Sequence, residues 1–197
     1  MYIDYLSNSR MKGNNTGREY LTAEELETVT KREFKSSRLE RVRDIYLFAC
    51  YTGLTYQDIK NLQKCQIIIA KDGTHWLSIN RSMMQKALYL PLSEIACHII
   101  DKYKDYSKEL LLPVPSIQKL NAYLKEIVAQ CNLDRNLSFQ SARSTFAVTI
   151  GIANNVSKIT LSKMFGFQDY ATRSTHISDK QISKEMLELS KKLVASK

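Results

Sequence analysis

Residues 137–147, LSFQSARSTFA, hold one arginine, Arg143, among side chains that donate or accept hydrogen bonds. A guanidinium can bind two phosphate oxygens at once and stays charged at any physiological pH. Gln140 can also hydrogen-bond a phosphate oxygen, but an amide cannot give up a proton as an imidazolium does. These two side chains can therefore position a phosphate, but neither supplies acid–base chemistry. The alternative for Arg143 is a surface salt bridge.

The apolar spacing around Arg143 predicts a helix from residue 139 to residue 153. Phe139, Ala142 and Phe146 would face the core, which leaves Arg143 at the edge of a groove. Two shorter helices are expected after it, at 157–165 and 170–176, and a last amphipathic one at 182–194.

The rest of the chain predicts an α+β fold, mainly α with a small three-stranded antiparallel β-sheet. Thr22 and Thr55 each precede an acidic residue by three positions, a capping pattern that starts a helix. The helices expected before residue 139 span 22–34, 37–51, 55–62, 95–103 and 117–129. Three β-prone runs at 67–69, 75–79 and 88–90 supply the strands, and Asp72-Gly73 is a strong hairpin signal between the first two.

Three blocks, in order and covering about residue 20 to residue 190, resemble the tyrosine recombinases, the phage-integrase family. They are LFACYTGLTYQDIKNL at 47–62, the sheet that closes in LYLPL at 88–92, and the pair 137–147 and 163–178. The segments RLERVRDIYLFACYTGL and QKLNAYLKEI especially resemble mobile-element integrases of Bacteroides-type bacteria. The resemblance implies the catalytic-domain fold of that family.

Enzymes of this family cut DNA by attack of a tyrosine hydroxyl on a phosphodiester, and the resemblance implies a position for each catalytic group. Arg143 is the only retained match. The replaced positions, from the first arginine to the nucleophile, are Thr55, Met83, Gln140, Ser144, Phe167 and His176. The resemblance therefore predicts a degenerate site that does not cut DNA, and it leaves Thr55 the structural role of a helix cap.

Two alternatives would each supply one of the missing catalytic groups. A shift in alignment would bring Lys86 or Arg81 to the place of Met83, where the family has a general-acid lysine. Tyr170 is the nearest other hydroxyl to His176, six residues earlier.

A formal net charge of +9 favours a polyanionic partner, because lysines and arginines that neutralise phosphates release condensed counterions. We expect double-stranded DNA as the partner. The expected phosphate contacts are Arg143, Arg81, Lys86, Lys60, Lys64 and Lys163. About 20 residues precede the first recombinase-like helix, too few for the arm-like domain that completes the family's clamp, so we expect weak, salt-sensitive binding.

The leading function is thus a DNA-binding integrase-family protein of a mobile element, without catalytic activity. One alternative is an interaction module that joins or inhibits assemblies of active integrases through 182–194, whose apolar residues are Ile182, Met186, Leu189 and Leu193. The other is an active recombinase with rearranged groups, which predicts a covalent protein–DNA adduct.

Domain organisation and location follow from composition. We expect an arm at 1–19, the integrase-like domain at 20–180 and a C-terminal helix at 181–197. No apolar run approaches the roughly 20 residues that span a bilayer, and no signal peptide is evident, so a cytoplasmic protein is expected, with neither a membrane nor a small-molecule substrate as partner. Four scattered cysteines predict reduced, buried side chains, with no metal and no cofactor.

Overall fold

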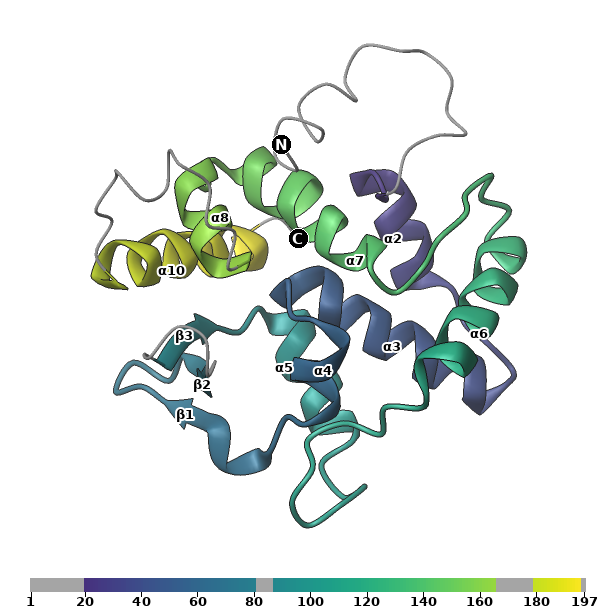
Figure 1. The fold of residues 1–197 in the computed structure, drawn as a ribbon, viewed down its shortest axis with the longest axis horizontal. Coiled ribbons are helices and arrows are strands. Elements are labelled where there is room, and N and C mark those ends of the chain that lie inside the picture. Colours follow the sequence, from purple (N-terminus) through teal and green to yellow (C-terminus); the bar gives the residue numbers. More distant parts are fainter. Residues whose placement is uncertain (1–19, 81–86, 166–178, 196–197) are drawn as a thin grey trace.

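Helix α3 (Ser37–Thr52) runs through the centre of the molecule, and α5, α6 and α7 pack against it (Figure 1). The computed structural model describes residues 20–80, 87–165 and 179–195. The other elements are α2 (Ala23–Lys31), α4 (Tyr56–Lys60), a 3₁₀ turn (Lys64–Gln66), β1 (Ile67–Ile69), β2 (His75–Asn80), β3 (Ala87–Pro91), α5 (Glu94–Lys102), α6 (Ile117–Gln130), α7 (Ser141–Thr145), a π-helical segment (Phe146–Gly151), a 3₁₀ turn (Ile152–Asn154), α8 (Lys158–Phe165) and α10 (Asp179–Ala195).

The C-terminal end of α3 brings two parts of the chain into direct contact. Gly53 caps the helix with a left-handed backbone, φ 68°. A Cβ on Gly53 would lie 2.6 Å from Cδ1 of Phe146, so the close approach of this turn to the Phe146 ring leaves no room for a side chain. The turn thereby fixes α4 next to the helical stretch that carries Arg143.

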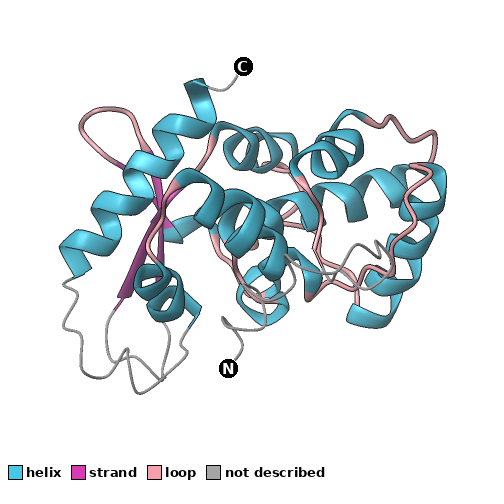
Figure 2. Ribbon diagram, turned by 90° about the horizontal axis from the view of Figure 1, so that it is seen from above, coloured by secondary structure: helices cyan, strands magenta, loops and turns pink. Residues whose placement is uncertain are grey.

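The three strands form one antiparallel sheet at one end of the molecule, in the order β1-β2-β3. Leu77 of β2 pairs with Ile67 of β1 and Leu90 of β3, and both leucines are fully buried. Figure 2 shows α10 crossing over this sheet. The helix packs on β3 and α5 of its own domain, where Ile182, Met186 and Leu189 are buried.

The predicted α+β fold is confirmed, together with most of its local signals. Thr22 and Thr55 each accept a hydrogen bond from the backbone N–H three residues on and form complete capping boxes. The predicted strands and the antiparallel pairing agree with the structure to within one residue at each end. Gly73 has the positive φ, 81°, that the hairpin signal requires.

The helix predicted from 139 to 153 differs from the observed one. Regular α-helix covers only Ser141–Thr145, after which the backbone turns into the π-helical segment and then the 3₁₀ turn. Apolar spacing fixes which side of a helix is buried, but it does not fix the hydrogen-bond register, which here changes inside the core. Three boundaries also move by more than one residue: α2 ends at Lys31, α4 ends at Lys60, and α10 starts at Asp179. The helix predicted at 170–176 lies outside the described residues.

The expectation of four buried cysteines is only half right. All four are free thiols, and Cys50 and Cys131 are buried, but Cys97 is half-buried and Cys65 is exposed. Cys65 lies in the 3₁₀ turn before the edge strand β1, where little covers it. Among the described helices, none is both long enough and apolar enough to span a membrane.

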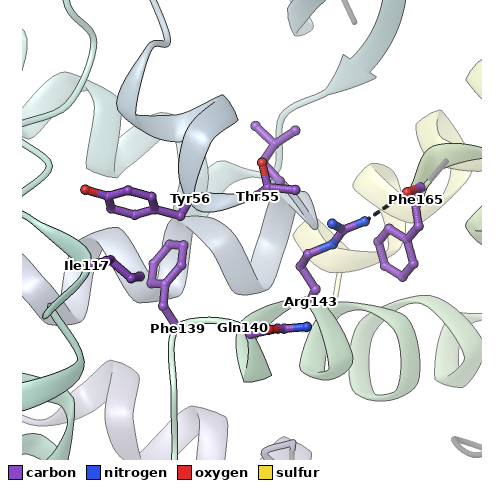
Figure 3. A pocket seen from close by; sticks show the side chains of 8 residues that line it. Thr55, Tyr56, Ile117, Phe139, Gln140, Arg143 and Phe165 are labelled. Carbon is purple, nitrogen blue, oxygen red and sulfur yellow. Dashed lines mark hydrogen bonds between the residues drawn. The ribbon is translucent and has the colours of Figure 1, made fainter. Parts of the chain in front are cut away.

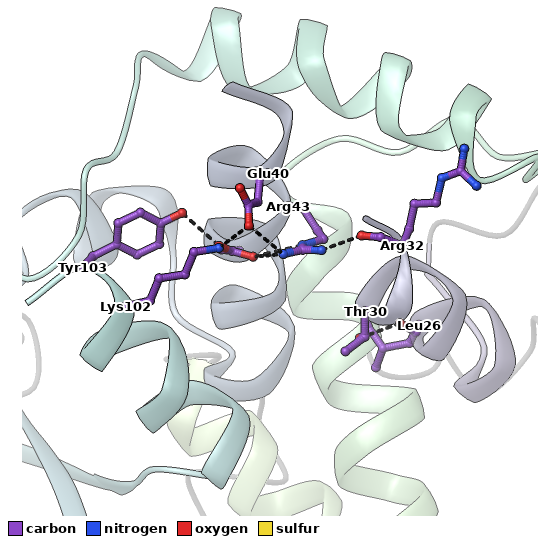
Figure 4. A network of polar contacts seen from close by, with 8 residues as sticks. Leu26, Thr30, Arg32, Glu40, Arg43, Lys102 and Tyr103 are labelled. Carbon is purple, nitrogen blue, oxygen red and sulfur yellow. Dashed lines mark hydrogen bonds and ion pairs between the residues drawn. The ribbon is translucent and has the colours of Figure 1, made fainter. Parts of the chain in front are cut away.

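A buried carboxylate joins α3 to α5 (Figure 4). Asp44, with its side chain 5% exposed, pairs with Arg43 at 2.8 Å and with the Lys102 ammonium at 2.7 Å. The Tyr103 hydroxyl donates to the same carboxylate at 2.8 Å, and Arg43 also donates to the Arg32 carbonyl just after α2. Burial, followed by the charge of Asp44, raises the pKa of Tyr103. The network ties α3 to α5 and to the end of α2.

Candidate functional site

A pocket of about 510 Å³ opens where the start of α4, the start of α6, α7 and the end of α8 come together (Figure 3). Its lining residues are Leu54, Thr55, Tyr56, Ile117, Phe139, Gln140, Arg143 and Phe165. Arg143 is the only charged one among these described lining residues. The local field in the pocket therefore favours an anionic group.

Arg143 is held by the last residue of α8. Its Cζ lies 4.5 Å from the centre of the Phe165 ring, and its Nη2 donates to the Phe165 carbonyl oxygen at 3.2 Å. The Phe165 ring in turn meets the Phe146 ring edge-on, with centroids 6.1 Å apart. The expected orientation is confirmed: Ala142 and Phe146 are fully buried, while Arg143 is half-buried and lines the pocket.

Thr55 has the structural role expected of it. Its Oγ1 accepts the Asp58 backbone N–H at 3.1 Å, and the Asp58 carboxylate accepts the Thr55 N–H at 3.0 Å. This reciprocal pair starts α4 and commits an acceptor lone pair of Thr55 to the helix. The hydroxyl hydrogen is a single neutral donor, so Thr55 gives the pocket no positive charge.

Gln140 precedes α7 and is exposed beside Arg143. In Figure 3 its side chain runs along the helix on the same side of the pocket as Arg143. The carboxamide offers two donors and one acceptor, but it has no proton to transfer at neutral pH. Arg143 and Gln140 together can hold phosphate oxygens without acid–base chemistry.

The opposite side of the pocket is built from aromatic rings with fixed orientations. The Tyr56 hydroxyl donates to the Pro115 carbonyl at 3.0 Å. Its ring meets Phe139 edge-on, with centroids 6.0 Å apart and planes 83° apart, and Phe139 meets Tyr46 in the same manner at 6.4 Å. These contacts lock the rings in place, so the pocket wall is formed before any ligand arrives.

Comparison with known proteins bears on the fold. No protein-family model and no curated protein sequence matches the chain. Solved structures do match: XerH site-specific recombinase bound to difH substrate has a TM-score of 0.62 at 16% identity, covering 86% of this chain and 54% of that one. The integrase from mycobacterium phage Brujita has a TM-score of 0.61 at 14% identity, with 93% and 64% covered. XerA recombinase has a TM-score of 0.60 at 15% identity, with 89% and 64% covered.

The fold is that of the tyrosine-recombinase catalytic domain. The chain spans 54% of XerH and 64% of each of the other two proteins. Because the identities are 14% to 16%, the match concerns the fold and assigns no chemistry.

On this recombinase fold, three of the predicted site residues come together in one pocket: Thr55, Gln140 and Arg143. Ser144 does not join them, because its side chain is buried in the core at 2% exposure. Three other predicted catalytic positions lie outside the described residues: Met83, Phe167 and His176. The same holds for Arg81, Lys86 and Tyr170.

The three other lysines predicted to contact phosphate do not line the pocket. Lys60 lies close by, with its Nζ 5.7 Å from the centre of the Tyr56 ring. The Lys64 ammonium donates to the Lys104 carbonyl, and Lys163 is half-buried on α8. They stay candidates for contacts with a long polyanion that extends beyond the pocket.

Sequence reasoning missed two residues of the site. Phe165 belongs to a block that the resemblance singles out, yet nothing in the chain indicates that its ring lies against Arg143, 22 residues earlier. Tyr56 directly follows Thr55 and could have been noticed for that reason. Both contacts depend on how α4, α7 and α8 pack, which local patterns do not encode.

Proposed function

We propose that this chain is a DNA-binding protein of the recombinase family, from a mobile element, that holds the DNA backbone and does not cut it. The observation that carries the proposal is the composition of the pocket lining among the described residues: one arginine, two neutral polar side chains and five apolar ones. A phosphoryl-transfer site needs several cations or donors around the phosphate, whereas one guanidinium is enough to position it.

Charge and fold support DNA as the partner. The net charge of +9 favours a polyanion. XerH, whose fold this chain shares, was solved bound to its difH substrate before and after cleavage. Arg143 would contact a backbone phosphate, and Lys60, Lys64 and Lys163 would supply further, sequence-independent contacts.

A titration of a labelled DNA duplex tests this function. At about 50 mM salt we expect a Kd in the range of about 10⁻⁶ to 10⁻⁴ M, weakening steeply as salt is added. Arg143→Gln should weaken binding and flatten the salt dependence by roughly one counterion. Arg41→Gln, which removes the same charge from an exposed site on α3, is the matched control. If tens of micromolar protein bind no duplex at low salt, the proposal fails.

The alternative of an interaction module built on 182–194 receives less support. Ile182, Met186 and Leu189 are already buried against β3 and α5 of the same chain, and Ser190 donates to the Leu92 carbonyl at 3.1 Å. Exchange of α10 between protomers would first have to break these contacts. Light scattering over a range of concentrations tests it: a concentration-dependent dimer would favour the module.

A further inference from the structure

The pocket around Arg143 has two ends with different chemistry (Figure 3). The polar side chains that can hold an anion gather at one end: Thr55, Gln140 and Arg143. The apolar side chains at the other end are Tyr56, Ile117 and Phe139. A bare phosphate needs donors on its oxygens and would use only the first end. The second end fits a flat, apolar group attached to the anion.

The size of the pocket also fits an organic ligand that carries an anionic group. Its volume of about 510 Å³ lies within the range of roughly 300–1,000 Å³ for sites that hold drug-sized organic ligands. A nucleoside monophosphate is a ligand of that class. Because Arg143 is the only charged residue in the described part of the lining, the ligand that complements this part of the pocket carries its negative charge at one end only.

The Tyr56 ring provides a surface for such a flat group. It is partly exposed, and it is fixed by its hydrogen bond to Pro115 and its edge contact with Phe139. Nucleobases stack on aromatic side chains of this kind whatever their sequence. Lys60, 5.7 Å from the ring centre, adds positive charge beside it.

We infer that the pocket binds one nucleotide unit, with its phosphate on Arg143 and its base against Tyr56. The inference rests on the proposed function, because both use Arg143 as the phosphate contact. The nucleotide can come from two sources: a free nucleotide, or an unpaired nucleotide of a DNA strand. Both present the same base, sugar and phosphate to the pocket.

Calorimetric titration of the full chain tests the inference with three probes: thymidine 5′-monophosphate, thymidine and inorganic phosphate. The monophosphate should bind about ten-fold or more tightly than either part, because only it occupies both ends. Tyr56→Leu should weaken monophosphate binding roughly 5- to 100-fold and leave phosphate binding unchanged. Arg143→Gln should weaken both. Tyr106→Leu, at a tyrosine 55% exposed outside the pocket, is the matched control for Tyr56.

Binding of a single-stranded thymidine oligonucleotide distinguishes the two sources of the nucleotide. If it binds more tightly than the free monophosphate, the ligand is an unpaired nucleotide of a strand, and if it binds more weakly, the ligand is a free nucleotide. The inference is overturned if phosphate binds as well as the monophosphate, or if Tyr56→Leu changes nothing. Duplex binding is measured in parallel: if it persists while the monophosphate fails to bind, this inference alone fails, and the reverse result removes the proposed function alone.

Discussion

The guanidinium of Arg143 lies over the ring of Phe165, 4.5 Å from its centre, and donates to the carbonyl oxygen of the same residue. The two residues come from different helices, α7 and α8. The final residue of α8 therefore sets the direction of the one charged side chain in the described lining of the pocket. A change at Phe165 acts on the anion site through Arg143 as well as through the pocket wall that Phe165 itself forms.

Replacing Phe165 by leucine removes the ring and keeps an apolar side chain of similar size. Loss of a cation–π contact worth about 0.5–1 kcal/mol should let Arg143 move and weaken duplex binding roughly two- to five-fold. The measurement is a duplex titration at low salt. Phe34→Leu is a matched control, since that ring also lies under an arginine, Arg43, at 5.8 Å, and neither residue is in the described lining of the pocket. If both variants bind equally well, Phe165 does not position Arg143.

Gly53→Ala tests the turn that brings α4 against the π-helical segment. Alanine at φ 68° is strained, and its Cβ would lie 2.6 Å from the Phe146 ring. We expect a loss of about 2–4 kcal/mol in the free energy of unfolding, from strain together with overpacking. Gly73→Ala separates the two effects, because φ there is 81° but no atom lies within 4 Å. It should cost only about 1 kcal/mol in denaturant unfolding. Equal losses would show that Phe146 moves aside.

Local signals were enough to predict most of the fold. The capping pairs at Thr22 and Thr55 and the turn at Gly73 each depend on residues within three positions of one another, so the sequence displays them directly. The contact of Arg143 with Phe165 and the packing of Tyr56 on Phe139 depend on tertiary geometry. The family pattern pointed to three pocket residues, yet it could not show that the pocket wall is aromatic.

The ion pairs of Asp44 were also missed, because no local pattern in the sequence shows which residues of other elements pair with an acidic side chain. Asp44→Asn would leave Arg43 and Lys102 without their buried anion, with the more exposed Glu40 carboxylate still beside both. Breaking such a pair by removing one partner costs about 3–5 kcal/mol, which denaturant unfolding would detect. Asp101→Asn is the control, because its salt bridge with Lys104 is exposed and should contribute little to stability. A small effect at Asp44 would mean that water replaces the carboxylate.

Glu185 on α10 gives the stability a pH dependence. Burial alone would raise its pKa, but the Ser157 backbone N–H, at 2.9 Å, and the hydroxyls of Thr160 and Ser157 lower it below the usual 4.5. A lowered pKa contributes stability that is present above pH 4.5 and is lost as the pH falls through the folded-state value. Since the carboxyl is partly exposed, we expect less than about 1 kcal/mol.

Glu185→Gln should therefore be less stable than the natural chain at neutral pH, and the difference should shrink in acid. Thermal unfolding at several pH values measures it. Glu188→Gln removes the same charge from an exposed site on the same helix and is the control. A difference between Glu185→Gln and the natural chain that does not change with pH would mean that the carboxylate's charge is not involved.

The last prediction concerns strand cleavage. By the family resemblance His176 stands at the nucleophile position. The described lining of the pocket offers one cation, Arg143, with Thr55 committed to its helix cap. A nicked suicide duplex should give no covalent adduct on a denaturing gel. His176→Tyr should give none either, because each missing donor costs about 10² to 10³ in rate even when a nucleophile is present. An adduct with the natural chain that His176→Ala abolishes would establish an active recombinase with rearranged groups. An adduct with His176→Tyr alone would show that the pocket retains the other groups needed for cleavage.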